Sequence, residues 1–285
     1  RSGTISDRTG LALLDAFGLP ANRANGTLIT GLVAVLIRCS FYAEQTPGDM
    51  SREPLVKGVA HLLHRVLAGP VDGVNVRRRA STRRRQAAVA APEGTDGDRV
   101  MRPRGEKTRQ RLLAAGASVL PERGYHDARV DDIVTAAGVS HGTFYRYFDN
   151  KDDFFRVLAE SASARMIELI DRLRLDADAA DLRAWLSEWF AAYEADGGVI
   201  STWQEMQTNQ ELADFSRQVA ASVFSRLVRH LEGRDFSDPL VDAVILLALI
   251  ERVPYSVYTL GFAEEHDAIE SMVTAIHRGI LARPD

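Results

Sequence analysis

The chain has 285 residues, of which 46% are hydrophobic and 26% are charged, a composition that is ordinary for a globular protein. No stretch reaches the roughly 18 uninterrupted apolar residues of a membrane span, and the first residues lack the apolar core of a secretory signal. Cys39 is the only cysteine, which excludes an internal disulfide and a cysteine-cluster metal site. We therefore expect a cytoplasmic protein without a metal or cofactor. Because the sequence does not begin with Met, we interpret the chain as a fragment or a processed product.

The net charge of −4 is distributed unevenly along the chain. Residues 1–69 carry seven Lys/Arg and five Asp/Glu, residues 70–151 carry sixteen and ten, and residues 152–285 carry twelve and twenty-four. A basic block beside an acidic one indicates a polyanion as partner of the middle segment and a different partner for the C-terminal part.

The N-terminal part predicts two helices and a linker. Residues 25–46 are mostly apolar, and residues 52–68 have apolar side chains at helical spacing, so segment 1–69 reads as a helical hairpin with a Pro-Gly break. Residues 70–104 are rich in Gly, Pro and Arg without an apolar period, which predicts a flexible linker. Its run RRRASTRRR (77–85) is either an arm that enters a DNA minor groove or a solvated linker that adds non-specific affinity.

From residue 106 the pattern is helical again. A first helix ends near Gly124, and a short second helix covers Val130 to Ala137, which Gly138 ends in a left-handed conformation. Ser140 is a natural N-cap for a third helix, and Asp149 or Asn150 caps a fourth. Further helices are predicted near 180–195, 200–206, 209–232, 238–261 and 265–282. Because strand signals are weak throughout, we predict an all-α fold.

One internal echo links the two ends of the chain. The segment LVAVLIRCSFYAEQ…PLVKGVAHLLHRVLA parallels LLALIERVPYSVYTL…AIESMVTAIHRGILA near the C-terminus. Each consists of a long apolar helix, a short break, and a helix with His-Arg near its end. The parallel suggests an internal repeat, with a register uncertain by one residue.

The spacing within residues 129–148 predicts a helix-turn-helix. This motif needs a modest residue where its two helices cross, a Gly in the turn and an apolar residue after it, and Val134, Gly138 and Val139 stand at those places. The second helix of such a motif lies in a DNA major groove with its first residues near the base edges.

The second helix of the predicted helix-turn-helix carries four aromatic residues within five positions, 144–148. Phe144 and Phe148 are four residues apart, so they share one face and are predicted to be core. Tyr145 and Tyr147 fall on the flanks, where their rings lean on the core and their hydroxyls reach outward. A phenol with one dry and one wet end suits a phosphate contact.

Residues 106–160, and above all the run IVTAAGVSHGTFYRYFDNKDDFF, resemble the N-terminal DNA-binding domain of the tetracycline-repressor (TetR/AcrR) family. The resemblance implies a three-helix DNA-binding domain over 105–155, followed by a helical-bundle ligand-binding and dimerisation domain over 156–285. The chain departs from the usual family pattern at several positions, with Val134 in place of Ala at the helix crossing and Gly116 in place of Ala in the first helix.

The resemblance also implies roles for single residues. The family's phosphate contacts match Thr143, Tyr145, Tyr147 and Lys151, and a frequent contact with the DNA backbone matches Arg109. The start of the recognition helix, where base edges are read, matches Ser140, His141 and Gly142. Arg129 replaces a neutral phosphate contact by a charged one, and Arg146 faces outward. The DNA-binding candidates are therefore Arg109, Arg129, Ser140, His141, Gly142, Thr143, Tyr145, Arg146, Tyr147 and Lys151.

The C-terminal half offers candidates for an effector cavity. Trp185, Trp189 and Tyr193 are spaced by four and form one helical stripe, which is either a pocket lining or ordinary core. Arg252 could hold an anionic group or form an ion pair with Glu251 or with a partner helix. Weaker candidates of the same kind are Trp203, Phe224 and Tyr255. We find no nucleophile elbow, phosphate loop or paired metal ligands, so we predict that the chain is not an enzyme.

The favoured hypothesis is a transcriptional regulator, a repressor that a small and largely apolar effector releases from a double-stranded operator with an inverted repeat. Family members dimerise through their last two helices, here 238–261 and 265–282, which implies a homodimer. Alternatively, segment 1–69 packs on those helices as an intramolecular pseudo-dimer, in a chain that derives from a tandem-repeat protein truncated at its N-terminus. The rival hypothesis is an interaction or nucleoid-type protein with a degenerate reader, which binds nucleic acid mainly through the Arg-rich linker.

Overall fold

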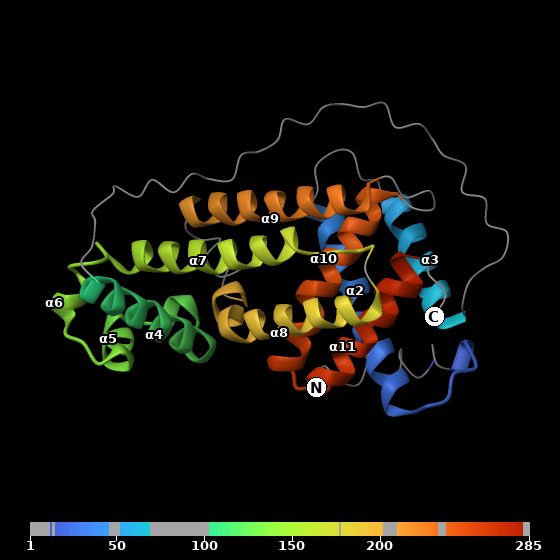
Figure 1. The fold of residues 1–285 in the computed structure, drawn as a ribbon, viewed down its shortest axis with the longest axis horizontal. Coiled ribbons are helices and arrows are strands. Elements are labelled where there is room, and N and C mark those ends of the chain that lie inside the picture. Colours follow the sequence, from blue (N-terminus) through green and yellow to red (C-terminus); the bar gives the residue numbers. More distant parts are fainter. Residues whose placement is uncertain are drawn as a thin grey trace. The chain divides into compact units, whose positions relative to one another are not determined.

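The computed structural model describes residue 12 and residues 15–45, 52–68, 103–176, 178–201, 210–232 and 238–281. Over these residues the chain is helical and contains no strand, which confirms the predicted all-α fold (Figure 1). The helices are α2 (Arg23–Gln45), α3 (Arg52–Ala68), α4 (Pro103–Asp127), α5 (Val130–Ala137), α6 (His141–Phe144), α7 (Lys151–Asp171), α8 (Ala179–Ser201), α9 (Gln210–Leu231), α10 (Pro239–Tyr258), α11 (Glu265–Thr274) and a π-helical turn η2 (Ala275–Ile280).

Most helix ends lie where the sequence predicts them. Gly124, with φ 71°, breaks the regular geometry near the end of α4, as expected for a residue that must adopt a left-handed conformation. The third helix is shorter than its aromatic pattern suggests, because α6 ends at Phe144 and the chain continues in a turn. The predicted linker and the predicted helix at 200–206 lie almost entirely outside the described residues.

The helices form two compact units. The helix-turn-helix unit contains α4, α5, α6 and α7 up to Leu169, the end of α8 from Ala191, and α9 up to Val223. The bundle unit contains α2, α3, α10, α11 and η2, together with α8 up to Phe190 and the end of α9 from Phe224. Helices α7, α8 and α9 are thus divided between the units.

The core of the helix-turn-helix unit is built largely from aromatic rings. Phe144, Phe148, Phe154 and Phe155 are all buried, and Ile133 of α5 packs in the same cluster. Gly116 of α4 has a specific place in it, because a Cβ added there would lie 2.4 Å from the ring of Phe154. The close approach of α4 to a buried ring gives a physical reason for Gly at this position.

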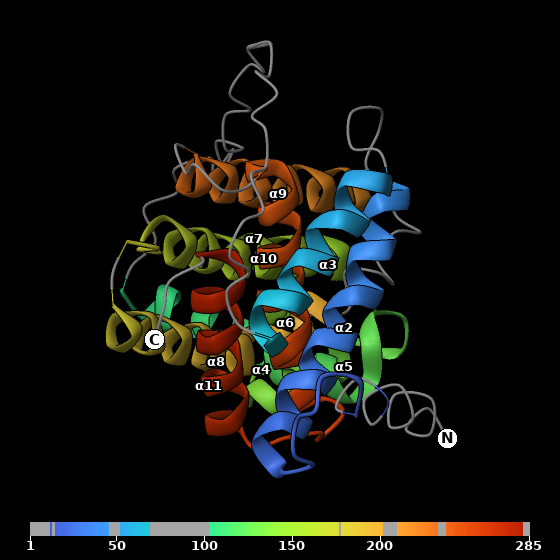
Figure 2. The ribbon, with the colours of Figure 1, turned by 90° about the vertical axis from the view of Figure 1, so that its right-hand side faces the viewer.

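Helix α10 is the centre of the bundle unit. Almost all its residues from Val241 to Val253 are buried, so it is apolar around most of its circumference, as expected for a helix covered on several sides. Helix α2 packs along α10 and also on α11, and α3 packs on η2 and α10 (Figure 2). Among the described residues, no helix is both long enough and apolar enough to cross a membrane.

Candidate nucleic-acid interface

The turn between α5 and α6 is held by backbone and side-chain hydrogen bonds. Gly138 adopts φ 61° and ψ 43°, and the Val139 N–H donates to the carbonyl of Val134 at 3.0 Å, which ends α5 in the predicted left-handed geometry. The guanidinium of Arg111, from α4, donates to the carbonyl of Ala137. Val134 itself is buried at the crossing of the two helices. The motif is therefore fixed from both its own turn and the neighbouring helix.

The start of α6 leaves polar groups accessible. Ser140 is the N-cap, since its Oγ accepts from the Thr143 N–H at 3.3 Å and lies 3.0 Å from the Thr143 hydroxyl. Gly142 is exposed, and a Cβ added there would meet no atom within 4 Å. The space above the backbone at Gly142 is thus open, so that a close neighbour such as a base edge can approach it.

The four rings divide as the helical spacing predicts. Phe144 and Phe148 are 0% and 2% exposed and contact each other with ring centroids 5.4 Å apart. Tyr145 is 54% exposed. Tyr147 is half-buried, with its ring on the core and the Arg146 guanidinium 5.6 Å from its centroid. The buried pair anchors α6, whereas Tyr145 and Arg146 are presented to solvent.

His141, the first residue of α6, contacts an acidic side chain. Its Nε2 forms a hydrogen bond with the carboxylate of Asp131 in α5, and both side chains are largely exposed, at 50% and 75%. His141 also stacks on Tyr145, with centroids 6.4 Å apart. A base contact by His141 would therefore compete with Asp131 or use its other ring nitrogen.

Lys151, the first residue of α7, is engaged by the protein itself. Its ammonium donates to the carbonyls of Tyr125, His126 and Ala128 at 2.9, 3.3 and 3.2 Å, and lies 4.9 Å from the Tyr125 ring centroid. Two of these carbonyls belong to the last turn of α4 and the third to the residue that follows it, where a cation is favourable. All three N–H donors thus have partners, and a phosphate contact by Lys151 stays a prediction.

The two remaining arginine candidates lie in the first half of α4 and directly before α5. Arg109 in α4 is near Glu106, at 3.7 Å, and is only partly exposed. Arg129 is the exposed residue before α5, and its backbone N–H donates to Asp132 at 2.9 Å. The Arg129 side chain borders an open cleft of about 540 Å³. The other residues lining this cleft are Arg123, His126, Asp127, Asp131 and Asp132.

Three contacts that support the motif have no signal in the local sequence pattern. Arg111 reaches Ala137 across 26 positions, and Lys151 reaches Tyr125 across a similar distance. The Tyr125 hydroxyl donates to Asp152 at 2.6 Å, and burial together with this carboxylate raises the pKa of Tyr125 above its usual value. These side chains join α4 to α5 and α7, so they position the motif.

The effector candidates are mostly packed. Trp185 and Trp189 stack with centroids 5.4 Å apart, both are buried, and the Trp189 indole N–H donates to the carbonyl of Ile250 at 2.7 Å. Arg252 does not pair with Glu251, which bonds to Arg38 instead; its guanidinium lies 4.4 Å from the Tyr255 ring centroid. Tyr193 is buried, Phe224 is half-buried, and Trp203 lies outside the described residues.

The comparisons agree with this geometry. Residues 112–158 match the family described as bacterial regulatory proteins, tetR family. This match covers α5, α6 and the turn between them, with parts of α4 and α7. Residues 112–158 therefore form a DNA-binding domain of the TetR type. The exposed residues from Ser140 to Arg146 lie within this matched region, and their contacts with DNA stay a prediction.

Curated relatives match part of the chain. The transcriptional regulator AcuR of Cereibacter sphaeroides is 41% identical over 85 residues, which covers 28% of this chain and 39% of that protein. The fatty acid metabolism regulator protein of Bacillus subtilis is 30% identical over 126 residues, covering 43% and 63%. A transcriptional regulator of the same family from Aquifex aeolicus has a solved structure that aligns with a TM-score of 0.49 at 18% identity, over 58% of this chain and 95% of that one. The chain thus matches less than two thirds of the length of either curated relative.

Proposed function

We propose that this chain is a sequence-specific DNA-binding transcriptional regulator of the cytoplasm, a repressor that a small-molecule effector releases from its operator. The observation that carries the proposal is the division of the aromatic pairs. Two phenylalanines anchor α6, while Tyr145 and Arg146 stand exposed next to an open backbone at Gly142. A short helix that is rigidly held and polar on its free face is what a DNA reader requires.

Fluorescence anisotropy of the full chain with labelled genomic fragments tests the DNA-binding step. The proposal requires that some fragment competes over bulk DNA at moderate salt, because non-specific phosphate contacts weaken steeply as salt rises. If every fragment binds like bulk DNA, the proposal is wrong.

A matched pair of variants separates the reader from the basic linker. Tyr145→Ala should abolish the preference for the selected fragment, whereas replacing the six arginines of 77–85 by Ser should leave that preference intact. In the rival nucleoid-type protein the result is reversed: the arginine variant loses binding together with most of its salt dependence, and Tyr145→Ala binds normally.

The effector is proposed to be largely apolar and to bind in the C-terminal helices. Trp185 and Trp189 are packed and the two described clefts are lined by other residues, so binding there would require the stack to open. One relative is named for fatty acid metabolism, which makes fatty acids the first probes. Quenching of intrinsic tryptophan fluorescence, together with release of the selected DNA fragment, would support this class. A probe that releases DNA without altering tryptophan emission would place the effector site elsewhere.

A further inference from the structure

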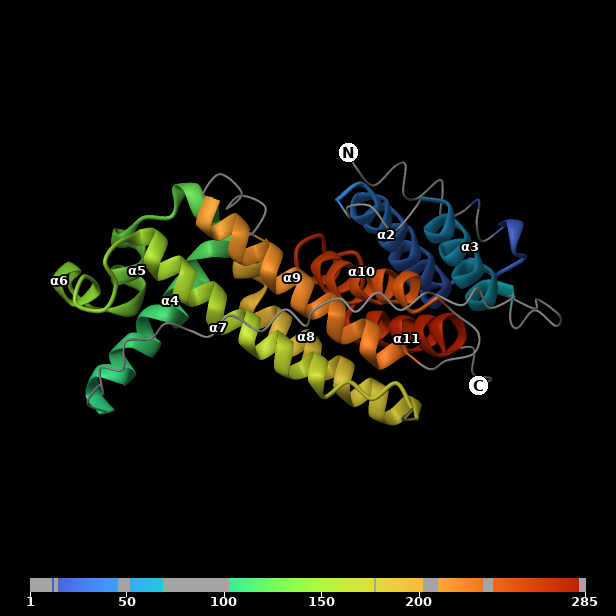
Figure 3. The same ribbon diagram turned by 90° about the horizontal axis from the view of Figure 1, so that it is seen from above.

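The bundle unit brings together the two hairpins that echo each other in sequence. Helix α2 packs along α10 and on α11, and α3 packs on η2 and on α10 (Figures 2 and 3). If the echo is aligned so that Arg38 matches Arg252 and Arg65 matches Arg278, then α2 corresponds to α10, and α3 corresponds to α11 with η2. Each N-terminal helix therefore packs on its own counterpart and on the counterpart of its neighbour, which is the pattern of two identical hairpins meeting around a two-fold axis.

Contacts between individual residues of the two hairpins show the same two-fold pattern. At a two-fold axis a residue meets its own equivalent in the other copy. In the alignment Val66 corresponds to Gly279, and a Cβ added at Gly279 would lie 2.9 Å from a methyl of Val66. Arg38 binds Glu251, the residue beside its equivalent Arg252, at 3.0 Å. The contact surface between the N-terminal hairpin (α2 and α3) and the C-terminal hairpin (α10, α11 and η2), called the seam below, thus resembles the interface of a two-fold symmetric dimer.

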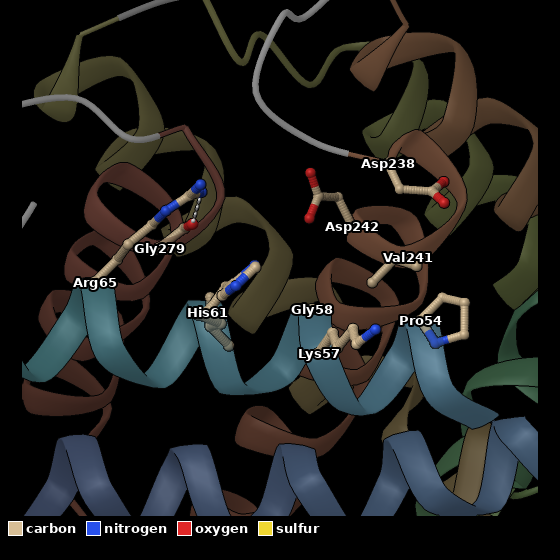
Figure 4. Close-up of a pocket in the computed structure, with 10 residues that line it drawn as sticks. Pro54, Lys57, Gly58, His61, Arg65, Asp238, Val241, Asp242 and Gly279 are labelled. Atoms are coloured by element: carbon tan, nitrogen blue, oxygen red, sulfur yellow. Dashed lines mark hydrogen bonds between the residues drawn. The ribbon is translucent and has the colours of Figure 1, made fainter. Parts of the chain in front are cut away.

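The hairpins approach too closely for a chance contact. A Cβ added at Gly58 of α3 would lie 2.1 Å from a methyl of Val241 in α10, and one added at Gly279 would lie 2.3 Å from a methyl of Leu62. The Arg65 guanidinium donates to the carbonyl of Gly279 at 3.1 Å beside a cleft of about 170 Å³ (Figure 4). Only glycine permits such approach at both points.

The N-terminal hairpin also buries an apolar face on this seam. Its side chains toward the C-terminal helices are almost completely covered, as in the core of a domain rather than in a transient contact. The buried residues are Ile29, Leu32, Val33, Val35, Cys39, Leu55, Val59, Leu62, Val66 and Leu67. No second chain is needed to cover the same face of α10 and η2.

We propose that residues 23–68 act as a built-in second copy of the C-terminal hairpin, so that the face of α10, α11 and η2 is occupied within the chain and the protein is monomeric. The proposal rests on the packing of the bundle unit alone and stands whether or not the chain binds DNA. It assigns a partner to the C-terminal hairpin, namely the chain's own N-terminal segment, and excludes a homodimer built on this face.

A designed disulfide tests the contact directly. A Cβ at Gly58 lies 3.5 Å from the Cβ of Val241, within the range of about 3.5–4.5 Å that a disulfide requires. In the full chain with Cys39→Ser, Gly58→Cys and Val241→Cys, mild oxidation should remove both free thiols. The product should run on a non-reducing denaturing gel as a single chain of 31.4 kDa with altered mobility. The matched controls carry Cys39→Ser with Val241→Cys alone, or with Gly58→Cys and Val241→Ala, which removes the clashing methyl, and they should keep their thiol.

Each other outcome overturns the proposal. A covalent dimer means that the hairpin packs on a partner chain, as in a swapped assembly. Two thiols that stay free while the variant is folded mean that the hairpin does not dock here. Sedimentation of the unaltered chain provides a measurement that needs no substitution: a mass of 31.4 kDa from low to high micromolar concentration is expected, and a tight dimer contradicts the proposal.

Discussion

Replacing Lys151 by Met removes the ammonium that binds the end of α4 while keeping a side chain of similar length. The bond to Tyr125 at 2.9 Å joins a charged donor to a partly buried carbonyl, which is worth about 1.5–3 kcal/mol, and the two longer bonds and the ring contact add less. These terms share one ammonium and do not add fully, so we expect the free energy of unfolding to fall by about 2–3 kcal/mol.

Urea unfolding followed by circular dichroism measures this loss, with Lys57→Met as the matched control. Lys57 forms an exposed pair with Glu53, so its replacement should leave the free energy of unfolding almost unchanged. In the same variants the salt dependence of DNA binding decides between this role and the phosphate contact predicted from the sequence: an unchanged salt slope leaves the Lys151 ammonium with the carbonyls. A Lys151→Met protein that is as stable as the parent, but whose salt slope falls by about one, would refute the reasoning and assign the ammonium to a phosphate.

Three further predictions follow from the described contacts. Gly116→Ala should destabilise the chain by about 1–2 kcal/mol in urea unfolding, because overpacking against the Phe154 ring outweighs the better helix propensity of Ala, and a neutral or stabilising result would contradict the contact. Tyr145→Phe should leave the unfolding midpoint unchanged and weaken specific DNA binding several-fold. Phe148→Ala should lower the free energy of unfolding by about 3–5 kcal/mol and abolish binding. Equal stability losses in the two variants would contradict the proposed division of roles. Burial raises the pKa of Cys39 to about 12, so the thiol ionises at a lower pH in the unfolded chain than in the folded one. The free energy of unfolding should therefore fall between pH 9 and pH 11 by about 1.4 kcal/mol per pH unit more than in Cys39→Ala. Parallel pH profiles for the two proteins would show that the thiol is accessible.

Much of the fold could be predicted because its signals are local. Gly138 ends α5, Ser140 caps α6, and Asn150 caps α7 by accepting from the Asp153 N–H at 2.8 Å. Each of these acts within three or four residues, so the sequence pattern contains both partners. The burial of Phe144 and the exposure of Tyr145 follow equally from helical spacing.

The remainder depends on residues far apart in the chain. Spacing could not show that Lys151 would bind the end of α4, or that Arg38 rather than Arg252 would pair with Glu251. The spacing of the aromatic residues also gave no sign that α6 ends after one turn. In the turn that follows α6, the N–H groups of Tyr147 and Phe148 both donate to the carbonyl of Phe144. The place of the N-terminal hairpin could be suggested from the echo, but the close contact at Gly58 required coordinates.

The most direct test of the proposed function is the ratio of two dissociation constants at one salt concentration, for the selected genomic site and for the same duplex with the bases facing α6 changed. Each altered base pair in a specific site costs about 1–3 kcal/mol, so three changes should weaken binding by at least about a hundredfold. The Tyr145→Ala protein should show almost no difference between the two duplexes. If the unaltered chain binds both duplexes equally, α6 does not read sequence and the chain is not the regulator proposed.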